Sequence, residues 1–281
     1  MQVPFGEWLP DQPEHLNPGA NVAKNVYYAL QGYKPFKSLV SYSSNTISSN
    51  SKGAGSFRDN TNTVYNFVAT STNIYQLDSG TFTSRKSSLT GGNTDFWTFT
   101  QFGNYVIASN GVDAPQYYLM GTSTNFANLS AIATDGTPPL FRVSGVIRDF
   151  LVVGNIVNAT NRIQWSGIND ISTWTEGSKS ADYQDLPGSG GKIVAITSGE
   201  VGYVFRQNQI IRMDYVGGAT VFRLSVISPN RGAVYGKTVC QDNRRVFFYA
   251  DDGFFQIDGD NIIAIGAEKV NRFFDSDLNK A

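Results

Sequence analysis

The sequence predicts an all-β fold, a β-propeller of about five to six four-stranded blades with an extended proline-rich N-terminal arm. Three observations support this prediction. A unit of short apolar and aromatic segments recurs with a ragged period of roughly 40 to 50 residues. Aromatic residues make up 13% of the chain and charged residues only 16%, a mixture that suits many short strands joined by polar turns. Half of the 10 prolines lie within the arm.

The arm comes first, and we assign it residues 1–46. Pro4, Pro10, Pro13, Pro18 and Pro35 fix φ and remove backbone donors, which favours an extended segment. A short helix is expected at 18–25, because Pro18 stands where a helix can start. The arm is rich in apolar side chains, so we expect a docking strap rather than a disordered leader. Its expected interface residues are Phe5, Trp8, Leu9, Tyr27, Tyr33 and Phe36.

The repeat follows, and residues 47–281 are assigned to the propeller. Its readable blades lie near 54–90, 96–130, 141–175, 192–228 and 232–266. The central apolar residues of the second segments are Phe67, Tyr105, Leu151, Tyr203 and Phe247, with spacings of 38, 46, 52 and 44 residues. Segments that are apolar on both faces, such as RRVFFYA, are typical of strands sandwiched between layers. The sequence allows three ways for the ring to close. The propeller has five blades, or the strap supplies the closing strands, or a further blade lies outside this sequence.

Turn residues separate the predicted strands. Asp251–Asp252–Gly253, Asn110–Gly111 and Asp258–Gly259 are expected to form tight hairpins, because these residue types tolerate positive φ. The single cysteine, Cys240, lies in an apolar strand pattern and is expected to be a small buried hydrophobe. LPGSGGK (186–192) has the wrong glycine spacing for a phosphate-binding loop and is interpreted as a flexible connection between blades.

Charge and hydropathy exclude several classes of function. The net charge is −1 from 22 basic and 23 acidic residues. Binding to duplex DNA needs clustered Lys and Arg, and the densest candidates, Arg85–Lys86 and Arg244–Arg245, are only pairs. The sequence contains no apolar run long enough for a transmembrane helix. The first residues lack the pattern of a signal peptide, which predicts an intracellular product.

Catalytic chemistry is sparse in this sequence. The only histidine is His15, so a Ser-His-Asp triad is not expected, and a zinc site is not expected because it needs several Cys or His and the chain has one of each. Paired carboxylates of the glycosidase kind are the remaining option. The candidates are Asp182, Asp185, Glu200, Asp214, Asp251, Asp252, Asp258 and Asp260. GINDISTW (167–174) departs from the Asp-box of sialidases at Asn169 and Ile171. We predict no enzyme activity, no cofactor and no metal.

Several longer phrases carry a family resemblance. They are WLPDQPEHLNPGANVAKNV, GYKPF, KGAGSFRD, NIYQLDSG, FGNYVIASNGVDAPQYY, RIQWSGINDISTW, SPNRGAVYGKTV and FFYADDGFFQIDGDNIIAIGAEKVNRFF. These phrases follow one another over nearly the whole chain. Together they resemble the nozzle, or tail-hub, proteins of short-tailed bacteriophages, also described as packaged-DNA stabilisation proteins.

The resemblance implies a structural protein of the virion, made in the cytoplasm of a bacterial host. Its propeller would stand in a homohexameric ring below the head-to-tail adaptor and prolong the DNA-ejection channel. The implied partners are copies of itself, the adaptor protein and tail fibres or spikes, with genomic double-stranded DNA passing through without specific binding. The family usually continues past the motif that ends in KVNRFF, so its last blade or a distal domain is expected to be shortened or absent here.

A second interpretation remains open. A carbohydrate-binding or receptor-binding propeller, lectin-like, would use Tyr117, Tyr118, Trp165 and Trp174 as platforms for sugars. Aromatic residues at repeating positions more often pack between blades. A glycosidase is the third and less favoured interpretation.

Overall fold

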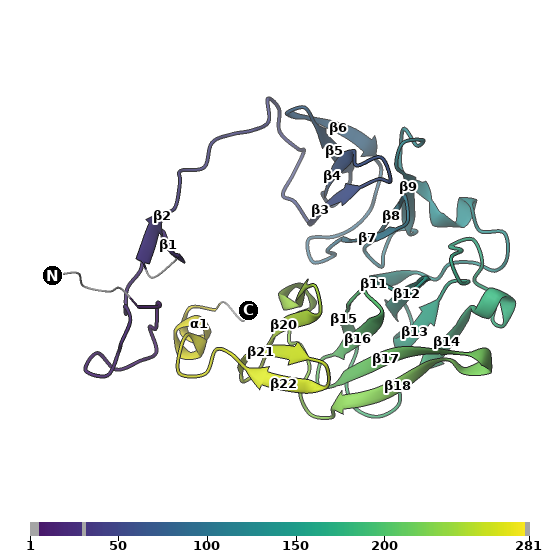
Figure 1. Cartoon of the computed structure of the whole chain (residues 1–281). Helices are drawn as coiled ribbons and strands as arrows, with labels where there is room; N and C mark the ends of the chain where they lie inside the picture. Colours follow the sequence, from purple (N-terminus) through teal and green to yellow (C-terminus); the bar gives the residue numbers. More distant parts are fainter. Residues whose placement is uncertain (1–5, 30–31, 279–281) are drawn as a thin grey trace. The chain divides into compact units, whose positions relative to one another are not determined.

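Five four-stranded sheets and one two-stranded hairpin contain the strands of the described chain (Figure 1). The computed structural model describes residues 6–29 and 32–278. Each four-stranded sheet is antiparallel and uses four strands that are consecutive in the sequence. This is the blade pattern of a β-propeller, and it confirms the predicted fold class.

The first four blades span residues 53–228. Blade 1 contains β3 (Gly53–Arg58), β4 (Val64–Ala69), β5 (Ile74–Asp78) and β6 (Thr81–Lys86). Blade 2 contains β7 (Thr98–Phe102), β8 (Tyr105–Ser109), β9 (Gln116–Leu119) and β10 (Ala127–Asn128). Blade 3 contains β11 (Phe141–Ile147), β12 (Phe150–Ile156), β13 (Ala159–Trp165) and β14 (Asp182–Asp185). Blade 4 contains β15 (Ile193–Ile196), β16 (Val201–Arg206), β17 (Ile210–Gly217) and β18 (Val221–Ser228).

The fifth blade and the arm complete the described elements. Blade 5 contains β19 (Cys240–Asp242), β20 (Arg245–Ala250), β21 (Gly253–Asp258) and β22 (Asn261–Ala264), and α1 (Asn271–Asp277) follows it. The arm holds the hairpin of β1 (Val26–Ala29) and β2 (Gly32–Pro35), which pair only with each other in the described structure. Short 3-10 turns lie at Leu129–Ala131, Ser178–Ser180, Gly218–Thr220 and Gly236–Thr238.

The chain packs as two compact units. Tyr42–Lys237 form one unit, which contains blades 1 to 4. Met1–Ser41 and Thr238–Ala281 form the other, which joins the arm to blade 5. The predicted boundary between residues 46 and 47 separates the arm from every blade. The grouping of the described residues differs from it, because the arm up to Ser41 contacts the segment that follows β22, whereas Ser44 and Asn45 hydrogen-bond to blade 1.

Apolar layers between neighbouring blades hold the four-blade unit together. One buried cluster joins blades 1 and 2, a second joins blades 2 and 3, and a third joins blades 3 and 4. All seven residues of β12 are buried, as expected for a strand covered on both faces. The first strands also pack in succession, β3 against β7, β7 against β11 and β11 against β15. Blades 2 and 3 are thus packed against a neighbouring blade on both faces.

The repeat markers all occupy equivalent places. Phe67, Tyr105, Leu151, Tyr203 and Phe247 lie in β4, β8, β12, β16 and β20, the second strand of each blade. The two tight turns of blade 5 are also present, since Ala250 pairs with Gly253 and Asp258 pairs with Asn261. Asn110–Gly111 does not form a tight hairpin and instead begins the longer loop between β8 and β9.

Three other expectations need correction. Residues 18–25 form no helix, because Leu9 N donates to Ala20 O and Ala20 N donates to Glu7 O, which folds this stretch back on the chain. Cys240 is exposed rather than buried, in a strand whose three residues are all exposed. The fourth strand of blade 3, β14, lies beyond the predicted end of its blade at residue 175, because a long loop follows β13.

The loop 186–192 is wrapped around a buried guanidinium and is not simply a flexible connection. Arg206 is 2% exposed and donates to the carbonyl oxygens of Pro187 (2.7 Å), Gly188 (3.1 Å) and Gly191 (2.8 Å). It also donates to Gln209 Oε1 at 2.9 Å. Burial lowers the pKa of Arg206, yet guanidinium groups stay protonated in proteins. The planar guanidinium therefore donates to three carbonyl oxygens of this loop at once.

Replacing Arg206 tests this arrangement. We expect Arg206→Lys and Arg206→Leu each to lower the free energy of unfolding by about 3 kcal/mol, because neither side chain can replace the four hydrogen bonds that the buried guanidinium makes. Chemical denaturation followed by tryptophan fluorescence measures the effect. The control is Arg244→Lys at an exposed position, which should shift the midpoint little. Equal stability of the Arg206 and Arg244 variants would contradict the role of the guanidinium.

Candidate functional site

The base of the strap is fixed to the segment after β22. Backbone N–H groups of Arg272 and Phe273, at the start of α1, donate to Asp11 Oδ2 and Oδ1, each at 2.8 Å. The Trp8 ring meets the Phe273 ring edge-on, with centroids 5.0 Å apart. Asp11 N also donates to Lys269 O at 3.1 Å. These contacts join the beginning and the end of the described chain.

Beyond this base the strap exposes apolar side chains. Tyr27 is 49% exposed and packs edge-on against Phe36, which is 65% exposed. Leu39 and Val40 follow at 94% and 84% exposed. Exposed apolar groups in one short segment mark a surface for interaction with a partner. The sequence analysis missed Leu39 and Val40, although two adjacent aliphatic residues in an extended polar segment were a readable signal.

The structure divides the predicted docking residues between two roles. Trp8 and Leu9 belong to the base, where Leu9 N donates to Ala20 O. Tyr33 donates its hydroxyl proton to Gly6 O at 2.9 Å. Tyr27 and Phe36 are the two that present large exposed surfaces. Phe5 lies outside the described residues. The prediction that this set docks on a partner stays a prediction.

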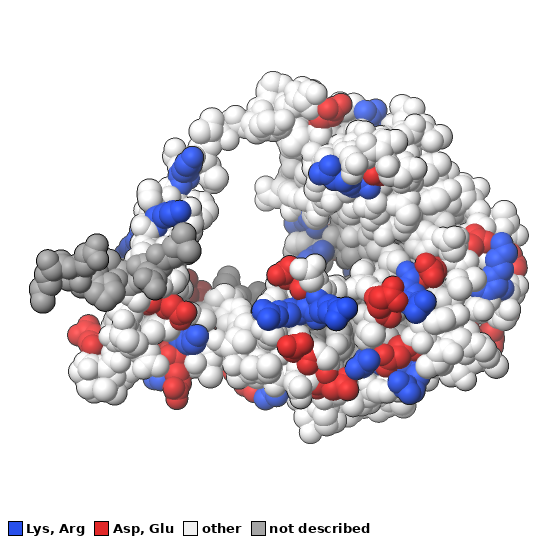
Figure 2. Space-filling model, in the orientation of Figure 1, with Lys and Arg blue, Asp and Glu red and all other residues white. Residues whose placement is uncertain are grey.

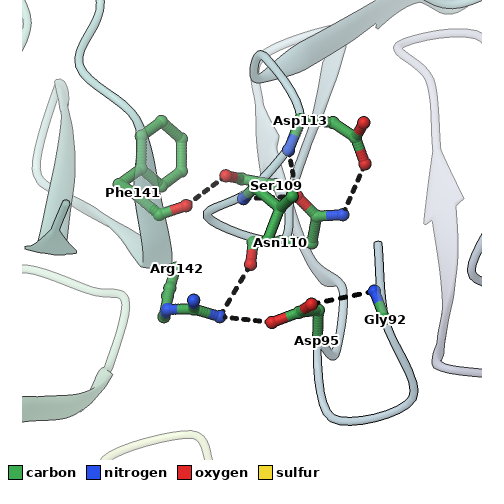
Figure 3. Close-up of polar contacts among 8 residues, drawn as sticks. Gly92, Asp95, Ser109, Asn110, Asp113, Phe141 and Arg142 are labelled. Atoms are coloured by element: carbon green, nitrogen blue, oxygen red, sulfur yellow. Dashed lines mark hydrogen bonds and ion pairs between the residues drawn. The ribbon is translucent and has the colours of Figure 1, made fainter. Parts of the chain in front are cut away.

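A polar cluster occupies the junction of blades 1, 2 and 3 (Figure 3). Arg142, in β11, donates from Nη1 to Asp95 Oδ1 and to Asn110 O, both at 3.0 Å. Asp95 Oδ2 accepts from Gly92 N at 2.8 Å, and Asn110 Nδ2 donates to Asp113 Oδ2 at 2.8 Å. We call Asp95, Asn110, Asp113 and Arg142 the Arg142 cluster.

The Arg142 cluster is built by local backbone demands. Asn110 directly follows β8, is fully buried, and accepts through Oδ1 from the N–H groups of Val112 and Asp113, each at 2.9 Å. Gly111 has φ +73°, and a Cβ there would lie 2.3 Å from Arg142 Cγ. Only glycine therefore lets Arg142 pass so close to this turn. The loop shape and the arginine position depend on each other.

Each carboxylate of the Arg142 cluster is engaged on both oxygens. Asp113 Oδ1 accepts from Thr90 N at 2.9 Å and from Thr90 Oγ1 at 2.8 Å, while its Oδ2 accepts from Asn110 Nδ2 at 2.8 Å. The hydrogen bond from Gly92 N, with the Arg142 charge, outweighs burial and holds the pKa of Asp95 below its usual value. A general base needs an available lone pair near its substrate. The arrangement suits a clasp between blades better than a reactive site.

None of the predicted candidate carboxylates belongs to this cluster, and three of them form ion pairs with nearby arginines. Arg162 holds Asp185 through two hydrogen bonds of 2.7 and 2.8 Å, which lower the pKa of that carboxyl. Asp214 pairs with Arg212 at 2.8 Å, and Glu200 pairs with Arg148 at 3.2 Å. Asp251, Asp252, Asp258 and Asp260 lie at the two hairpin turns of blade 5. In the described ranges, no three His, Cys, Asp or Glu side chains gather closely enough to hold a metal ion.

Asp170 organises the loop that resembles an Asp-box. Its Oδ1 accepts from Ser172 N at 2.8 Å, and its Oδ2 accepts from Lys179 Nζ at 2.6 Å and Thr173 Oγ1 at 3.0 Å. Burial acts to raise the pKa of Asp170, but these hydrogen bonds hold it well below its usual range. The carboxylate therefore stabilises the conformation of the loop between β13 and β14.

The aromatic residues of the lectin interpretation are mostly buried. Trp165 is 2% exposed, Trp174 3% and Tyr118 4%, whereas Tyr117 is partly exposed. Trp165 and Trp174 donate their indole protons to Ser180 O and Ile171 O, each at 2.8 Å. A sugar platform must present its ring face to solvent, so these three side chains cannot act as platforms in this structure. They pack in the blades instead.

Charge is distributed without a dominant sign. Lys and Arg are interspersed with Asp and Glu over the face in Figure 2, and most of that face carries no charged side chain. His15 lies exposed in the arm. Among helices of the described chain, none has the length and apolar character that crossing a membrane requires.

The comparisons with known proteins concern the fold. No family model and no curated protein matches this chain. One similar solved structure is the extracellular domain of a hybrid two-component system from B. thetaiotaomicron, with 12% identity and a TM-score of 0.51. The alignment covers 78% of this chain and 28% of that one, so this chain spans well under half of its length. At this identity the likeness describes the fold alone.

Two further solved structures align with lower TM-scores. BBS1N in complex with ARL6DN aligns at 11% identity over 89% of this chain and 75% of that one, with a TM-score of 0.47. BamB from Moraxella catarrhalis aligns at 13% identity over 69% of this chain and 54% of that one, with a TM-score of 0.42.

The Asp11 contacts predict the effect of a single substitution. Asp11→Ala removes the acceptor for two N–H groups at the start of α1, which costs about 1 kcal/mol of local stability. We expect faster amide hydrogen exchange in residues 6–21 and 266–277, measured by mass spectrometry. Glu14→Ala, at an exposed position of the same arm, is the matched control. Unchanged exchange in Asp11→Ala would show that the base is held by other contacts.

The depressed pKa of Asp95 predicts an acid-dependent contribution to stability. A carboxyl whose pKa is lower in the folded than in the unfolded chain stabilises the fold above the unfolded value, about 3.9 for aspartate. That contribution disappears as pH falls through the lower folded value. We therefore expect Asp95→Asn to destabilise the protein near neutral pH and to flatten its stability profile below about pH 4.

Denaturation midpoints measured between pH 2 and pH 7 test this expectation. The exposed carboxyl of Glu176 offers a control, because Glu176→Gln should leave the profile nearly unchanged. Parallel acid profiles for the wild type and Asp95→Asn would be inconsistent with an ion pair that stabilises the folded chain.

Proposed function

We propose that this chain is a structural subunit of a short bacteriophage tail, a nozzle or tail-hub protein that self-assembles around the DNA-ejection channel. The strap is the observation that carries the proposal, because its base is anchored within the chain while Phe36, Leu39 and Val40 point into solvent. A fixed base with an exposed apolar extension is suited to bridging two protein surfaces. The phrases that resemble nozzle proteins begin within this strap.

The charged and polar groups of the blades are compatible with a structural role in the wall of a DNA channel. Buried Arg206 and half-buried Asp95 and Asp170 hold loops and join blades. Charges of both signs are interspersed on the visible face, and DNA retention would require clustered phosphate-binding Lys and Arg. A channel that lets DNA leave benefits from weak contacts with phosphate. The proposed assembly partners are copies of this chain and the head-to-tail adaptor.

The exposed strap side chains give a direct test of docking. We expect Leu39→Ser combined with Val40→Ser to weaken self-association at least about tenfold, because two exposed aliphatic groups no longer leave water. Analytical ultracentrifugation and native mass spectrometry measure the association of the full chain. The control is Val216→Ser, at a position in β17 that is 49% exposed. Circular dichroism should remain that of the wild type in both proteins.

Particle incorporation tests the proposed place in the virion. Cryo-electron microscopy of phage particles that carry this chain should locate it in a ring below the adaptor. The double strap variant should be depleted from such particles, whereas Val216→Ser should be retained. A chain that stays monomeric and is absent from tails would overturn the proposal.

A further inference from the structure

The outer strands of the five blades differ in how they are protected against pairing with another chain. An exposed sheet edge is commonly protected by charged side chains, proline, very short length or a covering segment. β6 contains Arg85 and Lys86, β14 contains two aspartates, β18 contains Arg223, and β10 has two residues. β22, with the sequence NIIA, is longer than β10 and contains neither charge nor proline.

The outer edge of β22 carries exposed apolar side chains and has aspartates at one end. Ile263 is 46% exposed and Ile265, just after the strand, is 37% exposed. Asp258 and Asp260 lie exposed at the turn that leads into β22. β22 hydrogen-bonds to β21 on one side and is the last strand of its sheet. By contrast, the β6 edge is covered by its own chain, where Phe82 N donates to Asn45 Oδ1 at 2.8 Å.

The strap contains a segment with the complementary properties. Residues 36–41, which we call the strap segment, have the sequence FKSLVS and no helix or strand of their own. Leu39 and Val40 are the aliphatic residues, and because successive side chains of an extended chain point to opposite faces, each face receives one. Lys37 is exposed, as is Lys34 just before the segment. The segment thus offers apolar side chains behind two positive charges.

We propose that the strap segment of a second copy of this chain adds to β22 as a fifth strand of blade 5. The addition is parallel, because this direction places Lys37 beside Asp258 and Asp260 while Leu39 and Val40 run along Ile262 to Ile265. Backbone hydrogen bonds supply the affinity in such strand addition, and the side chains set the register. The inference rests on the proposed self-assembly and names the surface that receives the strap.

We assign the strand added to β22 to a second copy because every copy carries both the β22 edge and a strap segment. In the described structure, β22 is the last strand of its sheet, and the strap segment belongs to no sheet. Both belong to the same compact unit, whose strap base is already fixed by Asp11 and Trp8. Copies that exchange strap segments in a head-to-tail manner form a ring if the rotation closes. The ring of the proposed function is one such closure.

Cysteine cross-linking between two differently tagged full-length proteins tests the contact. Both proteins carry Cys240→Ser, one also carries Val40→Cys, and the other carries Ile263→Cys. Mild oxidation should give a disulfide-linked heterodimer. The matched control pairs Val40→Cys with Val226→Cys, a position 54% exposed on the charged outer strand β18, and should give little product. Equal cross-linking to both edges, or none to β22, would overturn the inference.

A single chain that carries both Val40→Cys and Ile263→Cys tests the own-chain alternative. At high dilution this protein should remain without an internal disulfide. Efficient intrachain cross-linking would show that the strap segment covers its own blade and would overturn the assignment to a second copy.

Charge reversal gives an independent measurement that uses no cysteine. Lys37→Glu should weaken self-association about tenfold, and adding Asp258→Lys with Asp260→Lys should restore it. Failure of the restoring variant, with all proteins folded, contradicts the parallel arrangement. Cross-linking without incorporation into tails would refute the proposed function alone. Tail incorporation without cross-linking to β22 would refute this inference alone.

Discussion

The structure depends on the burial of sheets that are apolar on both faces. A sheet such as that of blade 3, in which every residue of β12 is buried, is unstable unless other layers cover both sides. Successive blades meet this requirement for one another, and the three core clusters each combine residues of two neighbouring blades. The apolar layers therefore determine the order of the blades.

Polar groups inside this framework solve a second problem, which the apolar layers create. Packing takes some polar groups out of water, as it does the Arg206 guanidinium, and each such group then needs a hydrogen-bond partner. Arg206 supplies donors to the loop 186–192, while Asp170 supplies acceptors to the loop after β13. Arg142 joins the connection between blades 1 and 2 to the loop of blade 2. The charged groups in these places make hydrogen bonds to backbone N–H and carbonyl groups.

The repeat could be predicted from sequence because each blade carries its own local signal. Phe67, Leu151 and Phe247 occupy equivalent strands, since apolar segments and turn residues recur without reference to distant parts of the chain. The late start of β14 was not predictable in this way. The loop before it is held by the contact between Asp170 and Lys179, and no alternation of residue types reveals such a side-chain bridge. The exposure of Cys240 was likewise not predictable, because it depends on which distant residues pack against β19.

The strap shows where sequence reasoning reaches its limit. Its apolar content predicts docking, but Asp11 meets the Arg272 backbone 261 positions away, and no local pattern contains that information. This contact gives the strap a fixed point of departure. A tether held at its base searches a smaller volume than a free tail, so less entropy is lost when its exposed part binds. Anchoring the base within one chain therefore lowers the entropic cost of docking the exposed segment.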